Sequence, residues 1–229
     1  MSKKIGRTLI IPAAGTASRL RGFPKFLLPT HTNNVTLLER HISYLQNHFD
    51  EILIGINPDF TKILKAIISE NNKVKIYEMT TKTMMETVNL LTKKSSNENF
   101  MLIMPDTYFS DYRDIVAFLN QEKLDEATLL CWRIKEYQMG KLGQVYVDQS
   151  NHVVEIQDKN PLSKYEFFWG ATLFSAKHLL TAIDSDPHIG FLYERLIKQE
   201  VIVHGLMIQG DYYDCGTQEE YIEMLLKTR

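Results

Sequence analysis

The sequence is poor in the residues that build metal centres and disulfide frameworks. Only two of its 229 residues are cysteine, and Cys131 and Cys215 stand too far apart for a metal-binding spacing. We therefore expect two buried thiols in a reducing compartment. The net charge is only −2, which excludes attraction to nucleic acid or to an anionic membrane by bulk charge. A phosphate ligand would have to be held by local cations.

Long apolar runs are missing too. The basic N-terminus precedes a short apolar run, 9–11, which Pro12 closes and which is too short for the core of a signal peptide. No stretch approaches the length of a transmembrane helix. The sequence also contains no repeat, low-complexity segment or linker. We therefore expect a cytoplasmic protein with no membrane partner, built as a single domain over residues 1–229.

What the sequence does contain is an alternation of strands and helices, with a hydrophobic content of 44% that suits a large core. The predicted strands are 8–11, 51–56, 74–78, 100–104, 128–132, 144–148, 153–157, 167–174 and 201–208. The predicted helices are 59–69, 86–91, 111–120 and two that begin at the capping boxes 36–39 and 217–220. Helices separate the first four strands, which favours right-handed βαβ units and an α/β fold. The turn at 148–151 predicts a hairpin.

The loop after the first strand is the first candidate site. The strand ends on the small residues Ala13-Ala14-Gly15, and the cations Arg19 and Lys25 follow. Open α/β sheets bind ligands beyond the carboxyl ends of their strands. Small residues there allow a phosphate to approach backbone N–H groups, and the two cations would neutralise its charge. The spacing is neither that of a Walker P-loop nor that of GxGxxG. An ordinary loop with solvated cations is the alternative.

This loop resembles the signature of the sugar-1-phosphate nucleotidylyltransferases. The matching pattern is Ala14-Gly15-Thr16-x-Ser18-Arg19-Leu20 followed by Pro24-Lys25, with Ala17 where a second glycine is common. The short spacing between Arg19 and Pro24 is more similar to that of cytidylyltransferase relatives that act on methylerythritol phosphate or phosphocholine. The resemblance implies a Rossmann-like three-layer sandwich. Its sheet would be mixed and mostly parallel, with about seven strands and an antiparallel strand in the second half.

The resemblance also implies the reaction, in which an acceptor phosphate attacks the α-phosphorus of an NTP and releases pyrophosphate. Arg19 would stabilise the leaving pyrophosphate, and Lys25 would bridge the α-phosphate and its attacker. The implied nucleotide-binding residues of the loop are Ala13, Ala14, Gly15, Thr16 and Ser18. The acceptor phosphate is already ionised, so no side-chain nucleophile or general base is required. The sequence accordingly lacks a convincing Ser-His-Asp or Cys-His set.

Two acidic motifs resemble the metal-binding elements of the family. "LIMPDTYF" places Asp106 just after the fourth strand, and "YYDCGTQEEY" places Asp214 before Gly216-Thr217. The resemblance implies that Asp106 and Asp214 bind Mg²⁺, which takes one or two carboxylates together with substrate phosphates.

Two later motifs resemble the acceptor-binding strands. "GKLGQVYVDQSNHVVEIQDKNP" and "FFWGATLFS" imply acceptor contacts from Gly143, Asp158, Lys159 and Gly170. Asp158-Lys159 stands in place of the usual Glu-Lys, and Asn160 separates it from the proline.

The segment "EMTTKTMMETV" lies where the family reads the base. Its polar candidates are Glu78, Thr83 and Glu86, while Met84 and Met85 replace smaller residues. The predicted partners are therefore an NTP bound by the first half, with a pyrimidine nucleotide favoured, and a phosphorylated acceptor bound by the second half. A homodimer is among the assemblies that the resemblance allows.

Three alternatives stay open. Asp158-Lys159 favours a sugar 1-phosphate, whereas the short loop favours a CTP-dependent enzyme acting on a phosphorylated alcohol or a phosphonate. A metal-dependent glycosyltransferase uses a related sheet but usually has two aspartates near the fourth strand, where this chain has Asp106. A non-catalytic nucleotide sensor would be expected to lose Arg19, Lys25 or Asp106.

Overall fold

The computed structural model describes residues 6–31, 34–68, 71–121 and 127–228. Its strands are β1 Arg7–Ala13, β2 Glu51–Ile56, β3 Val74–Glu78, β4 Asn99–Ile103, β5 Thr107–Phe109, β6 Thr128–Arg133, β7 Gly143–Val147, β8 Val153–Asp158, β9 Phe167–Ser175, β10 His204–Met207 and β11 Tyr212–Asp214. Its α-helices are α1 Leu37–Leu45, α2 Thr61–Ile67, α3 Met84–Thr92, α4 Arg113–Leu119, α5 Gly190–Lys198 and α6 Gln218–Lys227. The 3-10 turns are η1 Ser18–Leu20, η2 Lys25–Leu27, η3 Gln46–His48, η4 Pro58–Phe60, η5 Glu136–Gln138 and η6 Ala176–Thr181.

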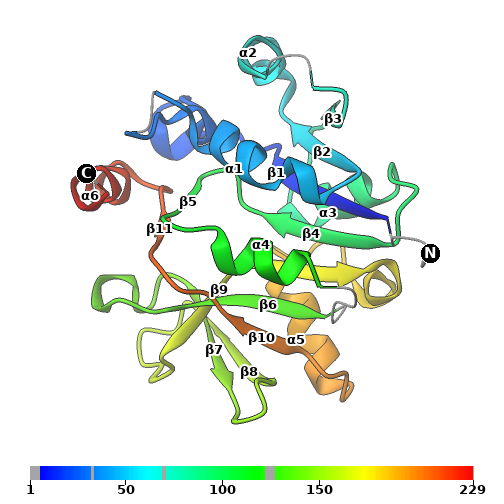
Figure 1. Cartoon of the computed structure of the whole chain (residues 1–229), viewed down its shortest axis with the longest axis vertical. Coiled ribbons are helices and arrows are strands. Elements are labelled where there is room, and N and C mark those ends of the chain that lie inside the picture. Colours follow the sequence, from blue (N-terminus) through cyan, green and yellow to red (C-terminus); the bar gives the residue numbers. More distant parts are fainter. Residues whose placement is uncertain (1–5, 32–33, 69–70, 122–126, 229) are drawn as a thin grey trace.

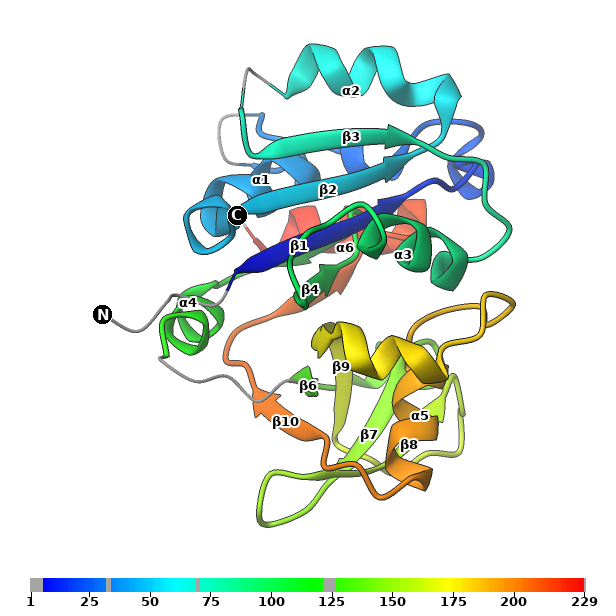
Figure 2. The same cartoon turned by 90° about the vertical axis from the view of Figure 1, so that its right-hand side faces the viewer.

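A nine-stranded mixed sheet runs through the molecule (Figures 1 and 2). Its main path has the order β10-β6-β9-β4-β1-β2-β3, and the hairpin of β7 and β8 joins it through β9. The strands from β4 to β3 along this path are parallel, and β9 is antiparallel to both β4 and β6. The predicted mixed sheet and its antiparallel strand are confirmed. The sheet exceeds the implied seven strands because the hairpin adds two to the main path.

Helices cover both faces of this sheet, which gives three layers. Successive residues of a strand point to opposite faces, so along β1 Leu9 and Ile11 enter one apolar core while Ile10 enters the other. Residues of α1, α2 and α4 fill the first core, and residues of α3 and α5 fill the second. Figure 2 shows α3 in front of β1 and β4. The predicted three-layer α/β fold is confirmed.

Both predicted capping boxes begin helices. Glu39 N donates to Thr36 Oγ1 at 3.2 Å, and Thr36 N donates to Glu39 Oε2 at 2.9 Å, at the start of α1. Glu220 N donates to Thr217 Oγ1 at 3.3 Å at the start of α6. The box at α1 is reciprocal, whereas at α6 the Glu220 carboxylate accepts from Thr217 Oγ1 at 3.1 Å, which leaves a side-chain cap. Both caps satisfy backbone N–H groups that a helix leaves without partners at its first turn.

Three of the α-helices and strands in the described residues were not predicted. Helix α5 begins after Ile189 without a side-chain cap, so it lacks the signal that marked α1 and α6. Strands β5 and β11 have three residues each, which is too short for a periodic pattern. They pair with each other in a ribbon apart from the main sheet. The predicted helix 59–69 becomes η4 and α2, and Ser69 lies outside the described residues.

Two expectations from composition can be compared with the structure. Cys131 and Cys215 are both free and buried, as predicted. Within the described ranges, no helix is long and apolar enough to cross a bilayer.

Candidate active site

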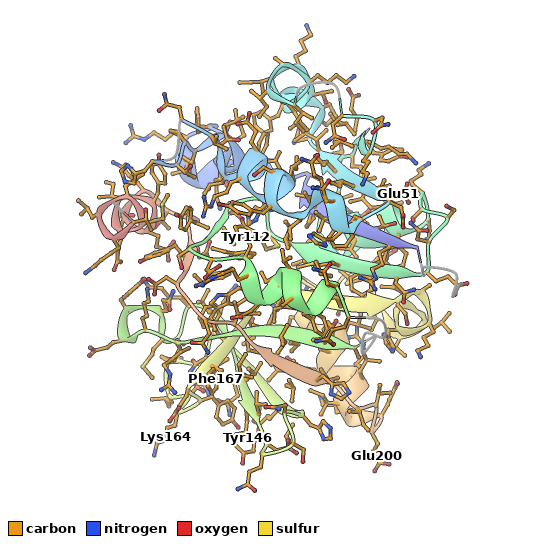
Figure 3. All side chains as sticks on the ribbon, viewed as in Figure 1. Glu51, Tyr112, Tyr146, Lys164, Phe167 and Glu200 are labelled. Carbon is orange, nitrogen blue, oxygen red and sulfur yellow. The ribbon has the colours of Figure 1, made fainter. Side chains whose placement is uncertain are left out.

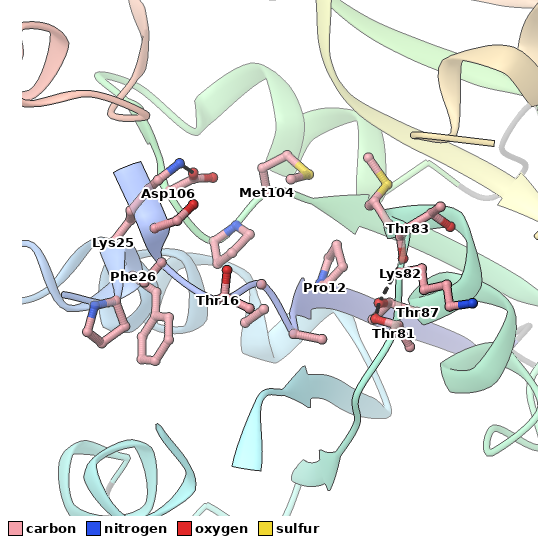
Figure 4. A pocket seen from close by; sticks show the side chains of 18 residues that line it. Pro12, Thr16, Lys25, Phe26, Thr81, Lys82, Thr83, Thr87, Met104 and Asp106 are labelled. Carbon is pink, nitrogen blue, oxygen red and sulfur yellow. Dashed lines mark hydrogen bonds and ion pairs between the residues drawn. The ribbon is translucent and has the colours of Figure 1, made fainter. Parts of the chain in front are cut away.

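A pocket of about 350 Å³ lies beyond the carboxyl end of β1 (Figure 4). Residues 12–18, 24–26, 81–84, 87 and 104–106 line it. This is the position at which open α/β sheets bind ligands, and the volume falls in the range of small-molecule sites. The pocket brings together eight of the predicted site residues, which are Ala13, Ala14, Gly15, Thr16, Ser18, Lys25, Thr83 and Asp106.

The loop after β1 exposes backbone donors to this pocket. Among the described residues, none accepts a hydrogen bond from the backbone N–H groups of residues 15–18. Ala17 adopts a left-handed conformation with φ 55°, and its carbonyl accepts from Leu20 N at 3.2 Å and from Gly22 N at 3.1 Å. Successive N–H groups of this kind form a concave site for an anion. Arg19 lies in η1, but its side chain is outside the described part of the structure, so its role stays a prediction.

Lys25 and Asp106 meet at one end of the pocket. Lys25 follows the extended residue Pro24 at the start of η2, and Asp106 lies in the turn between β4 and β5. Lys25 Nζ is 3.0 Å from Asp106 Oδ2, and the two side chains are only 16% and 17% exposed. Shielding from water strengthens such a pair relative to one on the surface. A cation and a carboxylate are therefore held together inside the pocket (Figure 4).

Threonine hydroxyls lie at the other end of the pocket (Figure 4). Thr83 caps α3, where its hydroxyl accepts from Glu86 N at 3.0 Å, and the hydroxyls of Thr81 and Thr87 are 2.6 Å apart. The Glu86 carboxylate instead accepts from the backbone N–H of residue 82 at 2.7 Å. Glu78 is exposed at the end of β3. Of the three predicted base-reading residues, Thr83 lines the pocket, whereas Glu78 and Glu86 do not.

Asp214 reaches the same region through the ribbon of β5 and β11. Asp214 stands opposite Thr107 in that pair, and Cys215 N donates to Asp106 O at 2.9 Å. Burial raises the pKa of the Cys215 thiol most, and the negative charges of Asp106 and Asp214 raise that pKa further. The two predicted metal ligands thus belong to one ribbon. Asp214 lines a separate small cavity beside Tyr137 rather than the main pocket.

The predicted acceptor residues lie in the second half of the sheet, outside the main pocket. Asp158 stands opposite Gly143 in the pair of β7 and β8. Lys159 follows in a left-handed conformation with φ 50°, and its N–H donates to Leu142 O at 3.2 Å. This geometry turns the chain sharply just after β8.

Neighbouring rings account for the small size of two predicted acceptor residues. A Cβ added to Gly143 would lie within 3.0 Å of the Trp169 indole, and one added to Gly170 would lie within 3.0 Å of the Tyr212 ring. A larger residue would therefore force these rings to move. Packing alone explains both glycines, and their contact with an acceptor stays a prediction.

His188 is a polar neighbour of Asp158 that the sequence did not reveal. His188 Nε2 is 3.2 Å from Asp158 Oδ2, with the side chains 16% and 24% exposed. The hydrogen bond from His188 is the main cause that lowers the pKa of the Asp158 carboxyl. Met84 N donates to Pro187 O at 3.3 Å, which joins the loop that carries His188 to helix α3 at the main pocket. A single histidine in a loop has no spacing signal, so sequence alone could not find it.

The fold and the pocket define an α/β protein whose ligand site, beyond the carboxyl end of β1, combines open backbone N–H groups with a lysine–carboxylate pair. Residues 9–201 match the model of the MobA-like NTP transferase domain, and the chain belongs to this family. It is therefore an enzyme of nucleotidyl transfer. The predicted resemblance to nucleotidylyltransferases is confirmed.

Solved structures support the same fold. A structure of UDP-glucose pyrophosphorylase complexed with UDP-glucose aligns with a TM-score of 0.80 at 13% identity, covering 98% of this chain and 100% of that one. A protein described as a glucose-1-phosphate thymidylyltransferase from Bacillus anthracis aligns with a TM-score of 0.76 at 19% identity, covering 98% and 96%. The inositol-1-phosphate CTP transferase from T. maritima aligns with a TM-score of 0.75 at 15% identity, covering 100% and 98%. A comparison with curated protein sequences found no match.

Proposed function

We propose that this enzyme couples a nucleoside triphosphate to a sugar 1-phosphate and releases pyrophosphate. An oxygen of the acceptor phosphate forms a bond to the α-phosphorus, and the bond from the α-phosphorus to the bridging oxygen breaks. The electron pair of that bond leaves on pyrophosphate. Both reactants are anions, so positioning and charge neutralisation supply most of the catalysis. The observation that carries this proposal is the Lys25–Asp106 pair, which shares a pocket with a loop of open backbone donors.

Different pocket residues would perform different parts of this reaction. Backbone N–H groups of residues 15–18 would bind the outer phosphates, and Arg19 would neutralise the leaving pyrophosphate. Lys25 would lie between the α-phosphate and the attacking oxygen, since its ammonium is already held in the pocket by Asp106. The base would then lie at the threonine end, where hydroxyls offer both donors and acceptors.

A pyrimidine nucleotide is the base class that we favour. The relatives of known structure are named for thymidylyl transfer, for UDP-glucose and for CTP. Thr81, Thr83 and Thr87 provide a polar end of the pocket that suits the edge of a small base.

We propose that Asp106 and Asp214 would hold Mg²⁺ together, since Cys215 N donates to Asp106 O and so brings the two carboxylate-bearing segments side by side. Mg²⁺ usually takes one or two carboxylates and completes its coordination with substrate phosphates and water. Among the described residues, no group of three or more His, Cys, Asp or Glu side chains is placed to hold a metal, so substrate phosphates would supply the remaining ligands. When bound, the ion would neutralise phosphate charge. The two carboxylates would hold this positive charge near Lys25, which already contacts Asp106.

Asp158 is the residue that we assign to acceptor recognition. Its Oδ2 atom is bonded to His188, which leaves Oδ1 to accept from a sugar hydroxyl. Lys159, next to it, would contact the acceptor phosphate. Gly143, opposite Asp158 on β7, and Gly170, on the next strand β9, would contribute backbone surface.

A cytidylyltransferase that acts on a phosphorylated alcohol or a phosphonate is the second candidate. The fold similarity to an inositol-1-phosphate CTP transferase favours it, as does the short spacing between Arg19 and Pro24. A metal-dependent glycosyltransferase is a weaker candidate because it would not need Lys25 beside Asp106.

We also propose that residues 1–229 act as one domain in the cytoplasm, with the NTP bound by the first half and the acceptor by the second. The two free buried thiols suit a reducing compartment. A homodimer is the assembly that we propose to test first, by light scattering.

The experiment that tests the function is a screen for pyrophosphate release. Five NTPs are combined one by one with a panel of sugar 1-phosphates, phosphorylated alcohols and phosphonates, with Mg²⁺ present. We expect release that requires both substrates and is greatest for a pyrimidine NTP with a sugar 1-phosphate. Release of free nucleoside diphosphate from an added nucleotide sugar, without pyrophosphate, would instead identify a glycosyltransferase.

A further inference from the structure

The acidic residues of the site are carried by a ribbon that needs outside support. Strands β5 and β11 pair with each other but with no strand of the main sheet among the described residues. A ribbon of two short strands is marginally stable by itself in water. The position of Asp106, just before β5, therefore depends on what the ribbon contacts.

The hydrogen bonds of the ribbon fix which carbonyl groups face outward. Cys215 N donates to Asp106 O at one end, and Ser110 N donates to Asp211 O at the other, both at 2.9 Å. Bonded and non-bonded residues alternate along an antiparallel pair. The carbonyl groups of the odd-numbered residues of β5 consequently point away from β11.

Helix α1 supplies partners for both of these outward carbonyl groups. His41 Nε2 is 2.9 Å from Thr107 O, and Arg40 Nη2 donates to Phe109 O at 3.1 Å. His41 is fully buried and Arg40 is 7% exposed. These two consecutive side chains occupy the edge of β5 where a third strand would otherwise pair.

The orientation of the His41 ring is fixed from its other side. Tyr112, labelled between α1 and α4 in Figure 3, places its hydroxyl 2.8 Å from His41 Nδ1. Because a carbonyl only accepts, Nε2 carries the proton toward Thr107, and Nδ1 accepts from Tyr112. Thr107 Oγ1 in turn donates to Met104 O at 2.9 Å. One chain of hydrogen bonds thus holds the turn on both sides of Asp106.

We propose that His41, held by Tyr112, is a positioning residue that sets the place of Asp106 and thereby the affinity of the Asp106–Asp214 pair for a divalent cation. This inference rests on the proposed metal role of the two aspartates. Without the His41 bond, the Thr107 carbonyl is left unpaired in a buried place and the turn is released. Removing a hydrogen bond that orients a metal ligand typically weakens metal affinity by about 10-fold to 100-fold.

The test uses Mn²⁺ as the probe and measures its binding to the full chain by the electron paramagnetic resonance of the free ion, with a non-hydrolysable NTP analogue present. His41→Leu removes both ring nitrogens, and Tyr112→Phe removes only the hydroxyl that orients the ring. We expect His41→Leu to weaken Mn²⁺ binding about 10-fold or more, and Tyr112→Phe to weaken it by a smaller but measurable factor. His41→Gln keeps an amide donor that can reach Thr107 O, and we expect it to restore most of the affinity.

Two controls separate this inference from the proposed function and from a loss of stability. Asp106→Asn retaining wild-type Mn²⁺ affinity would refute the metal role itself. Loss of affinity in Asp106→Asn, together with wild-type affinity in Tyr112→Phe and in any folded His41→Leu protein, would overturn the positioning role alone. Tyr193→Phe removes a buried hydroxyl that donates to Leu173 O on the other side of the sheet, and we expect wild-type Mn²⁺ affinity from it. Equal weakening in Tyr193→Phe would also overturn the inference. If His41→Leu does not fold, Tyr112→Phe decides.

Discussion

At the residue scale, the two lysines that line the pocket differ in their surroundings. Lys25 is mostly buried and bonded to Asp106, whereas Lys82 is exposed near the threonine end. Electrostatic stabilisation is strongest where a charge is fixed and shielded from water. Catalysis should therefore depend on Lys25 far more than on Lys82.

We expect Lys25→Ala to lower kcat/KM by roughly 100-fold or more, because the α-phosphate loses a fixed positive charge. Lys25→Arg should not restore activity, since a planar guanidinium cannot replace a compact ammonium between two phosphates. Lys82→Ala is the matched control and should stay close to wild type. Steady-state kinetics of the three variants measure these effects. Near-normal kinetics of Lys25→Ala would show that the loop after β1 is an ordinary surface loop with solvated cations.

Glycines offer a second comparison, of stability rather than rate. Gly143→Ala places a methyl group against the Trp169 indole, and overpacking of this kind costs about 1–3 kcal/mol in the free energy of unfolding. Gly15→Ala meets no atom within 4 Å and should unfold at the wild-type denaturant concentration. Urea unfolding of both proteins tests the comparison. An equally stable Gly143→Ala protein would show that the indole moves aside freely.

At the element scale, sequence patterns predicted the parts of the fold that local chemistry dictates. The nine strands of the main sheet and the capping-box helices follow from alternation, apolar runs and side-chain caps. The loop of residues 13–18 was predicted from its small residues after an apolar strand, and the structure places it at the pocket. By contrast, the ribbon of β5 and β11, the buried His41 contact and the Asp158–His188 pair join residues far apart in the chain. Local patterns in the sequence cannot reveal such contacts, because the contacts form only when the sheet brings distant residues together.

The buried His41 on α1 also makes a prediction about stability and pH. Burial is the main cause that lowers its pKa to about 3 in the folded protein, against about 6.5 for an ordinary histidine. Below pH 6.5 the His41 side chain binds a proton in the unfolded chain but stays neutral in the folded protein. The contribution of His41 to the free energy of unfolding is therefore full above pH 6.5 and is lost as the pH falls toward 3.

Between pH 7.5 and 5.5, this residue alone should lower the free energy of unfolding by about 1.4 kcal/mol. Urea unfolding at the two pH values measures the loss in wild type and in His41→Gln. The variant keeps every other titrating group, so the difference between the two proteins isolates His41. Equal losses in both proteins would show that the histidine titrates normally in the fold.

At the scale of the whole molecule, the order of strands separates the two regions that we propose for the NTP and the acceptor. The pocket after β1 belongs to the first half of the chain, while Asp158 ends β8 in the second half and Lys159 follows it. The loop before α5 connects the two through the Met84–Pro187 hydrogen bond. The two substrates should therefore respond to different substitutions.

We expect Lys159→Ala to raise KM for the acceptor strongly and to leave KM for the NTP nearly unchanged. Asp158→Asn should blunt discrimination among sugars, because a site built to read a hydroxyl rejects analogues that lack it. If the acceptor is a small phosphorylated alcohol, the same change should have little effect. A two-substrate kinetic matrix for wild type and both variants tests this. Weakening of the NTP alone by Lys159→Ala would reverse the assignment of the two halves.

The most direct measurement of the central claim follows the oxygen atoms of the acceptor phosphate. The acceptor is labelled with ¹⁸O at its phosphate oxygens and incubated with the NTP that the screen selects, and the products are analysed by mass spectrometry and ³¹P NMR. Attack by the acceptor phosphate predicts one pyrophosphate per acceptor consumed, a new diphosphate linkage, and complete retention of the label in the nucleotide-linked product. Formation of pyrophosphate with no labelled linkage, or release of labelled inorganic phosphate from the acceptor, would contradict nucleotidyl transfer.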